Sequence, residues 1–308
     1  MTQQPRRTAR RIAGLGAAAD LAVAVLVVPA VAGTAAAQPA PGAVGPGVRL
    51  VTPLGEVAEL CTANFLFDGG GTLYLGAAAH CTGTEDSTGS VNGCVEPVQP
   101  EGTEVRIEGR DGRTYTGTLA YNSWVTMQDI GEDDPAACSF NDFALIELSP
   151  EAAAAADPTV PGFGGPVGLE VGGTRSGETV YSHQPNQLAA TPNKQGVSLG
   201  RPESPRMHVV VTAPPGVPGD SGSGYLDSEG RAFGVLSSLL APTTANGVTD
   251  IAQALDYAMT YGGIDDVRLV PGTRPFTPGR TAQPMTELPS GPQLPDSPLP
   301  ELTPSPLR

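Results

Sequence analysis

The chain has 308 residues and a formal net charge of −15. Such an acidic chain repels nucleic acid and anionic membrane surfaces, because binding phosphate groups requires clustered Lys and Arg. Aromatic residues are few (5%), whereas Gly (40) and Pro (32) are abundant, which is typical of short strands joined by turns. Composition therefore argues against a nucleic-acid-binding protein and favours an all-β body of one large or two small domains.

The N-terminus has the pattern of an export signal. A basic stretch over 6–11 precedes an apolar run over 21–32, and small residues follow at 35–37. The apolar run is shorter than the ~20 residues that a membrane span needs. We expect residues 1–37 to be a secretory signal peptide cut after Ala37, with the general secretory route favoured over twin-arginine export. The mature protein is then extracellular or cell-wall associated, with no membrane insertion.

Cysteine and histidine usage bears on cofactors. An even number of cysteines in an oxidising compartment favours two disulfides over metal binding, and spacing leaves three pairings open: Cys61, Cys81, Cys94 and Cys138. Two of the three histidines belong to no motif: we expect His183 in a surface loop and His208 in a strand. No metal-site spacing joins them to the scattered acids. We predict no metal and no cofactor.

Composition shifts divide the rest of the chain. A Pro/Gly/Ala-rich linker is predicted over 38–50 and the folded body over 51–272. The tail, 273–308, is predicted to be disordered or polyproline-like, because 11 prolines fall in the last 38 residues with almost no apolar clustering. A role as a stalk remains the functional alternative for it.

Short apolar runs alternate with turn clusters throughout the body, which favours a barrel or sandwich over βαβ units. The predicted strands are Ala63–Phe67, Thr72–Ala78, Glu104–Ile107, Tyr115–Tyr121, Phe143–Leu148, Met207–Thr212 and Ala232–Leu239. Two stretches are predicted to be helical: a single turn at Glu151–Ala156, and Ile251–Tyr261 behind a Thr249-Asp250 cap. The apolar face of the longer helix would comprise Ile251, Leu255, Ala258 and Met259.

The strongest chemical motif is Gly219-Asp220-Ser221-Gly222-Ser223. A serine hydroxyl is a weak nucleophile unless a base takes its proton and donors hold the developing oxyanion. The glycines allow a tight turn in which the N–H groups of Gly219 and Ser221 can point at one spot. A plain β-turn is the alternative interpretation.

Two further residues could complete a catalytic set with Ser221. His80 stands beside a cysteine at the end of an apolar run, and Asp142 heads an apolar strand where its carboxylate could accept the Nδ1–H of an imidazole. A structural histidine and a turn-capping aspartate are the alternatives, with Asp133 and Asp134 as weaker rivals. The order His, Asp, Ser matches one protease class among known triads, and the spacings fit a site between two barrels.

With these motifs the sequence resembles the chymotrypsin-like (trypsin-like) serine proteases, in particular the secreted bacterial type. The matching pieces are Ala78-Ala79-His80-Cys81, Asp142-Phe143-Ala144-Leu145-Ile146, Gly219-Asp220-Ser221-Gly222 and Gly234-Val235-Leu236-Ser237. The resemblance implies an all-β fold of two six-stranded antiparallel β-barrels, a C-terminal helix, and catalysis in the cleft between the barrels.

Roles carried over from the family fall on matching positions. Ser221 would attack the scissile carbonyl, His80 would serve as base and then acid, and Asp142 would orient His80. The N–H groups of Gly219 and Ser221 would form the oxyanion hole. Ser237 matches a serine that hydrogen-bonds the catalytic aspartate and whose backbone pairs with substrate. The family also implies a Cys61–Cys81 bridge, which leaves Cys94 with Cys138.

The sequence departs from the family at activation and at specificity. No Ile-Val-Gly-Gly-like start is present to supply the amine that pairs with the Asp before the nucleophile, so Asp220 needs another partner, for which we suggest an Arg. Too few residues separate the signal from the body for a large pro-segment. Pro215 occupies the position that sets specificity at the pocket base, Leu236 stands where a histidine would favour acidic residues, and Leu239 should narrow the pocket.

The sequence therefore predicts a secreted serine endopeptidase that forms an acyl-enzyme on protein or peptide substrates. It should prefer small or medium apolar residues before the cut, and it should be a monomer. The alternative is a catalytically weak or inactive surface protein of the same fold that binds a partner and is extended by the Pro-rich tail. An esterase with the same triad is a third hypothesis.

Overall fold

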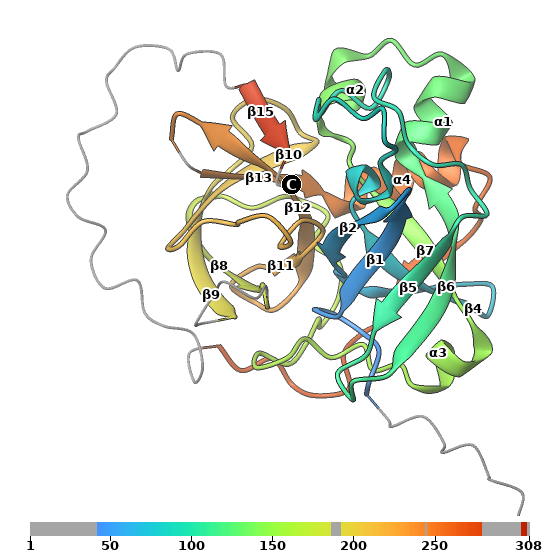
Figure 1. Ribbon diagram of the computed structural model, residues 1–308. Coiled ribbons are helices and arrows are strands. Elements are labelled where there is room, and N and C mark those ends of the chain that lie inside the picture. The colour runs from blue at the N-terminus through green and yellow to red at the C-terminus, as the bar shows by residue number, and fades with distance from the viewer. Residues whose placement is uncertain (1–41, 186–191, 244, 279–302, 307–308) are drawn as a thin grey trace, which may run out of the picture. The chain divides into compact units, whose positions relative to one another are not determined.

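The computed structural model describes residues 42–185, 192–243, 245–278 and 303–306 (Figure 1). The predicted signal peptide, 1–37, lies outside them. None of the helices among these residues has the length and apolarity that crossing a bilayer requires. The described residues form two antiparallel sheets, one of eight strands and one of seven.

The first sheet closes into a six-stranded ring. Its strands are β1 (Arg49–Leu54), β2 (Val57–Thr62), β3 (Leu66–Gly69), β4 (Thr72–Ala77), β5 (Glu104–Glu108), β6 (Thr114–Asn122), β7 (Ala144–Leu148) and β14 (Val267–Leu269). β2 and β3 are the two halves of one bent strand, joined by residues 63–65. The ring then runs β1, β2/β3, β4, β7, β6 and β5, and β5 pairs with β1 again. β14 adds to β3.

The second sheet closes in the same way. Its strands are β8 (Ser176–His183), β9 (Asn193–Leu199), β10 (Met207–Thr212), β11 (Gly224–Leu226), β12 (Ala232–Ala241) and β13 (Ala245–Asp250), with β15 (Thr303–Pro306) added to β12. The order β11-β8-β9-β10-β13-β12 is a ring because β12 also pairs with β11. The predicted all-β fold of two six-stranded antiparallel barrels is confirmed.

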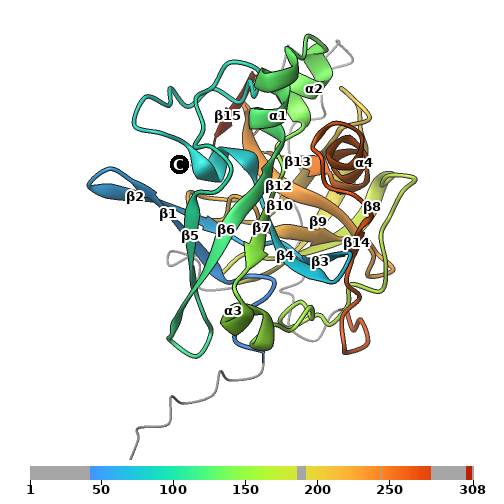
Figure 2. The same ribbon diagram turned by 90° about the vertical axis from the view of Figure 1, so that its right-hand side faces the viewer.

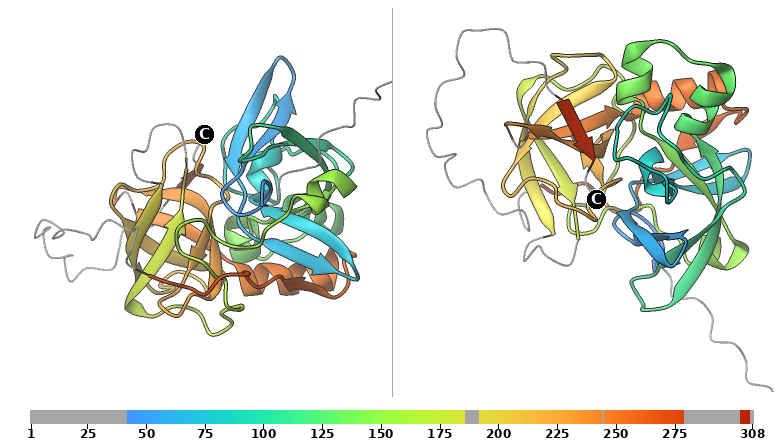
Figure 3. Two further views of the ribbon diagram at one scale, coloured as in Figure 1. Left: turned by 90° about the horizontal axis from the view of Figure 1, so that it is seen from below. Right: turned by 45° about the horizontal axis from the view of Figure 1, so that its top comes forward.

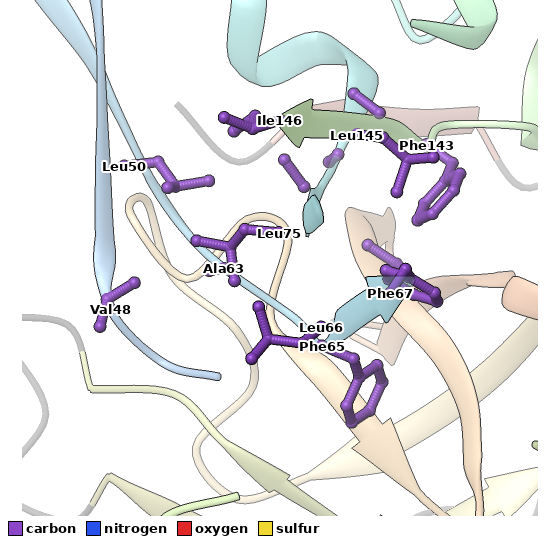
Figure 4. Packing of buried hydrophobic residues seen from close by; sticks show 14 of the residues in the cluster. Val48, Leu50, Ala63, Phe65, Leu66, Phe67, Leu75, Phe143, Leu145 and Ile146 are labelled. Atoms are coloured by element: carbon purple, nitrogen blue, oxygen red, sulfur yellow. The ribbon is translucent and has the colours of Figure 1, made fainter. Parts of the chain in front are cut away.

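Alternating side chains explain how the strands build a core. In β5 every second residue is buried, so Val105 and Ile107 point into the first barrel while their neighbours face solvent. Figure 4 shows apolar side chains from several strands converging there, among them Leu50, Leu75 and Phe143. Each such side chain contributes about 1.5–3 kcal/mol when removed from water.

Outside the barrels, the described residues form four α-helices and one 3-10 turn: η1 (Ala79–Thr82), α1 (Ser123–Ile130), α2 (Pro135–Phe140), α3 (Pro150–Ala154) and α4 (Ile251–Tyr261). The predicted C-terminal helix has the bounds of α4, and Asp250 caps it by accepting the N–H of Gln253 at 2.9 Å. On the predicted apolar face, Ile251, Leu255 and Ala258 are buried, whereas Met259 is 39% exposed. α4 follows β13 of the second barrel yet packs into the core of the first and beside α1 (Figure 2), which ties the barrels together.

Two predicted boundaries need correction. The linker expected over 38–50 contains Val44 and Val48, which are buried in the core of the first barrel. Backbone hydrogen bonds hold them there: the N–H of Val44 donates to Ala155, and the carbonyl of Val48 accepts the N–H of Ala63. The tail expected from 273 begins with packed residues, since Phe276 contacts the ring of Tyr181. Within the same tail, residues 303–306 form β15 rather than an irregular segment.

Candidate active site

His80 and Asp142 meet on the second-barrel side of the first barrel. η1 carries His80 directly after β4, and Asp142 lies between α2 and β7. Asp142 accepts two hydrogen bonds from His80, one from the backbone N–H to Oδ1 (3.0 Å) and one from ring Nδ1 to Oδ2 (2.7 Å). An ionised carboxylate only accepts, so the proton of a neutral His80 lies on Nδ1 and Nε2 carries the ring's lone pair.

Ser237 adds a third donor to the same carboxylate. Its Oγ donates to Oδ2 of Asp142 at 2.6 Å from β12 of the second barrel. The pairing of β12 with β13 shifts register between Leu236 and Ser238, and such a bulge re-aims the residue within it. Burial raises the pKa of Asp142, but the facing His80 and the hydrogen bonds from His80 and Ser237 outweigh it and lower that pKa below its ordinary value.

Ser221 lies in a tight turn that hydrogen bonds fix to both barrels. Gly219 and Gly222 have φ of 92° and 87°, the region that glycine adopts without strain. The N–H of Gly222 donates to Leu236 of β12 at 2.7 Å, and the carbonyl of Ser221 accepts the N–H of Thr62 of β2 at 2.8 Å. The turn therefore lies at the junction of the barrels, and a Cβ added at Gly222 would lie 3.3 Å from the backbone nitrogen of Ala78, two residues before His80.

The partner of Asp220 is a lysine and not the suggested arginine. Lys194, the only lysine in the sequence, extends from β9 and donates its Nζ to Oδ2 of Asp220 (3.2 Å) and to the carbonyl of Pro215 (3.1 Å). Both side chains are almost completely buried. Burial lowers the pKa of Lys194, and the charge of Asp220 offsets only part of this shift. A buried ion pair therefore fixes the residue before Ser221.

Two disulfides brace the first barrel with the pairing that the resemblance implies. Cys61 is bonded to Cys81 and Cys94 to Cys138. The first bridge joins β2 to η1 next to His80. Cys61, His80 and Cys81 bring their ligand atoms within 4.8 Å of one another, but both sulfurs are committed to the disulfide and supply no thiolate for a metal.

Pro215 and Leu239, the residues predicted to shape the specificity pocket, are both half-buried but have different neighbours. Pro215 is half-buried, and its carbonyl accepts a hydrogen bond from Lys194. Leu239 is half-buried on β12 and packs against the second-barrel core around Val180 and Tyr225. On the other side of the Ser221 turn, a cleft of about 480 Å³ is lined by Leu60, Thr62, Pro218, Gly219, Arg49 and Arg110.

Comparison with known proteins gives structural but no sequence matches. No family model and no curated protein matches the chain. Thermobifida fusca Protease A is 16% identical over 74% of this chain and 98% of its own, with a TM-score of 0.44. A glutamic-acid-specific serine protease is 17% identical over 74% and 100% (TM-score 0.44), and a Glu endopeptidase 16% over 70% and 89% (0.45).

Two closed six-stranded rings, followed by one C-terminal helix that crosses from the second ring to the first, decide the architecture. The chain has the chymotrypsin-like fold. In this chymotrypsin-like chain, His80, Asp142 and Ser237 are joined by hydrogen bonds, and the Ser221 turn contacts strands of both barrels.

The structure also shows where His208, His183 and Asp134 lie relative to their predicted positions. His208 lies in β10, as predicted, with Nε2 2.9 Å from Asp250 and Nδ1 2.7 Å from Thr174. His183, expected in a surface loop, is instead the half-buried last residue of β8, held by Asn193 at 2.6 Å. Asp134, a rival for the catalytic carboxylate, caps α2.

Sequence reasoning missed the role of Lys194 and that of Asn122, the last residue of β6, which supports η1. Asn122 donates to the carbonyl of Ala79 and to Thr82, and it also caps α1. The signal for Lys194 was present, because one lysine among 16 arginines at a buried strand position requires an explanation. Nothing in the local sequence indicates that Asn122 faces η1.

Proposed function

We propose that this protein is a secreted serine endopeptidase, with Ser221, His80 and Asp142 as its catalytic triad. The observation that carries the proposal is the Asp142 carboxylate, which accepts the Nδ1–H of His80 at 2.7 Å and the hydroxyl of Ser237 at 2.6 Å from the opposite barrel. A binding protein has no need of a buried carboxylate that sets the tautomer of a histidine beside a serine turn.

The reaction follows from these positions. Ser221 Oγ attacks the carbonyl carbon of the scissile peptide as His80 takes its proton, and Asp142 stabilises the imidazolium that results. The N–H groups of Gly219 and Ser221 hold the oxyanion. The tetrahedral intermediate collapses when His80 gives the proton to the leaving amine, which leaves an acyl-enzyme on Ser221. A water activated by His80 then attacks the ester and releases the acid product.

Substrate preference and location belong to the same proposal. Pro215 supplies no acid at the position expected for the pocket base, and we expect the half-buried Leu239 to narrow the pocket, so small or medium apolar residues should precede the cut. Two disulfides and the predicted signal favour an oxidising, extracellular setting. The buried Lys194–Asp220 pair removes one reason for the inactive alternative, because Asp220 no longer depends on a cleaved N-terminus for its partner.

The test is covalent labelling of the mature secreted protein with a fluorophosphonate probe. We expect labelling of the wild type and of Ser228→Ala, an exposed serine on the same barrel, and none of Ser221→Ala. His80→Ala and Asp142→Ala should lower the labelling rate by several orders of magnitude. Labelling that survives in Ser221→Ala, or absence of labelling in the wild type, would refute the proposal. A peptide-library profile dominated by Arg or Lys before the cut would refute the specificity.

A further inference from the structure

One edge of β12, beside the candidate active site, is paired with β15, a segment from the C-terminal part of the same chain. β11 pairs with the first part of β12, up to Val235. Beyond that point β15 takes the same edge, pairing antiparallel so that Thr303 lies opposite Ala241 and Pro306 opposite Ser238. Figures 1 and 3 show β15, drawn in red, beside the second barrel.

This edge leads directly to the catalytic groups. The residue of β12 that precedes Ser238 is Ser237, which donates to Asp142. β15 runs from Ala241 toward Ser238, so it approaches that hydrogen bond at about 3.3 Å per residue. An extended peptide presented to Ser221 along β12 would need the same edge. Ser221 and His80 are both buried, with exposed fractions of 0% and 8%.

The sequence of β15 fits the pairing. In an antiparallel pair, residues alternate between those whose N–H bonds to the partner strand and those whose N–H faces away. Proline has no N–H and is tolerated only at the second kind of position on an edge strand. Pro304 and Pro306 are two residues apart, so both face away in one register, and Thr303 and Ser305 remain to donate toward β12.

We propose that residues 303–306 act as a tethered, substrate-like ligand that occupies the substrate strand of β12 and competes with peptides for the cleft. The competition with substrate rests on the proposed function, whereas the docking does not. Twenty-four residues separate position 278 from Thr303, enough to span several tens of Å. A tether of this kind gives an effective concentration on the order of mM, so even a weak contact is populated within one molecule.

A register-shifted tail tests the docking in the full-length mature chain. The four substitutions Thr303→Pro, Pro304→Thr, Ser305→Pro and Pro306→Ser keep the composition but put prolines at the donating positions. The barrel should be unaffected, because its ring of β8 to β13 closes without β15. A matched control, Leu294→Pro with Pro295→Leu, makes the same kind of exchange outside β15.

The first readout is fluorescence anisotropy of a labelled peptide of residues 299–308 in chains that carry Ser221→Ala. We expect the shifted-tail chain to bind it on the order of tenfold more tightly, or better, than chains with the native or control tail. A peptide with the shifted order should not bind. Equal affinity for all chains, or for both peptides, would overturn the proposal. Dimers that form as protein concentration rises would also overturn it, since the tail would then come from a second copy.

The second readout uses chains with Ser221 intact and an extended peptide substrate. The shifted tail should lower KM by a similar factor and leave kcat unchanged, because only a competitor is removed. Peptide binding in Ser221→Ala chains needs no catalysis, so an inactive wild type with normal binding would refute the proposed function and not the docking. Active wild type with no peptide binding would refute the docking alone.

Discussion

Lys194 places its ammonium 3.2 Å from the carboxylate of Asp220, the residue immediately before Ser221. The resemblance to digestive proteases implies that a newly cut N-terminal amine should occupy this position. Here a side-chain amine reaches it from β9, and its second hydrogen bond, to the carbonyl of Pro215, ties down the segment that precedes the Ser221 turn. We expect the loop that carries Gly219 and Ser221 to be ordered without any cleavage.

Replacing Lys194 with Met should disable the site. The change leaves a buried carboxylate without its cation, which costs about 3–5 kcal/mol of the free energy of unfolding. The Ser221 turn then loses its anchor, and fluorophosphonate labelling should fall by about 10²-fold or more, as when oxyanion donors are misplaced. Labelling rate and urea unfolding, measured on the same samples, check both effects.

The control for this change is the double variant Lys194→Met with Asp220→Asn. Without either charge, most of the lost free energy of unfolding should return, because an uncompensated buried charge no longer exists. Wild-type labelling by the Lys194→Met single variant would contradict a positioning role for the pair.

The same pair predicts an alkaline limit to activity. Burial lowers the pKa of Lys194, although Asp220 raises it in part, so Nζ loses its proton at a lower pH in the folded than in the unfolded chain. Between these values the unfolded chain binds more protons, and this group's contribution to the free energy of unfolding rises with pH. The ion pair disappears, but the neutral amine can still donate hydrogen bonds to Asp220 and Pro215, which the Met side chain cannot. Labelling should therefore fall while the stability contributed by this group does not.

Lys194→Arg separates this group from others that titrate in alkali. A guanidinium keeps its proton to higher pH, so the alkaline fall in labelling should move upward in this variant. If the alkaline fall in labelling stays at its wild-type pH in Lys194→Arg, a group other than Lys194 causes it. Measurement of the labelling rate against pH, with circular dichroism at each pH to confirm folding, provides the answer.

Local patterns in the sequence were sufficient for much of the fold. The bounds of β10 and α4 match the prediction because an uninterrupted apolar run and a capped 3.6-residue period are local signals. The strand predicted at 63–67 was placed across a bend, since β2 ends at Thr62 and β3 begins at Leu66. Only pairing with both β1 and β4 makes that bend, and such long-range pairing leaves no local pattern.

The site residues also divide into those with a local sequence signal and those brought together only by long-range contacts. His80, Asp142 and Ser221 belong to short motifs that can be read in order along the chain. The Lys194–Asp220 contact joins residues 26 apart through the barrel, and the β15–β12 pairing joins a Pro-rich segment to a strand more than 60 residues earlier. Composition suggests disorder for that segment, and an edge strand donating at alternate residues is compatible with the same composition.

Ser237→Ala should remove one hydrogen bond to the Asp142 carboxylate, lower the free energy of unfolding and leave the fold intact. Loss of a hydrogen bond to a charged group costs about 1.5–3 kcal/mol of the free energy of unfolding. The pKa of folded Asp142 lies below its unfolded value of about 3.9, so its stabilisation is present above that pH and is lost as pH falls through the folded pKa. Removing one donor raises the folded pKa, and the acid-unfolding midpoint should move upward. Ser228→Ala is the control, and an unchanged midpoint in Ser237→Ala would count against the contact.

Gly222→Ala should abolish labelling because the added Cβ clashes with β2. Gly177→Ala is the control, because it brings the same backbone strain without a clash. A Cβ at Gly222 would lie 2.4 Å from the carbonyl oxygen of Thr62, so the Ser221 turn would have to move away from β2. Gly177 has the same φ of 87° but has no atom within 4 Å of an added Cβ. Both variants incur the backbone strain of positive φ, roughly 1–2 kcal/mol. Only Gly222→Ala should lose Ser221 labelling, and equal labelling of the two would show that the turn tolerates displacement from the first barrel.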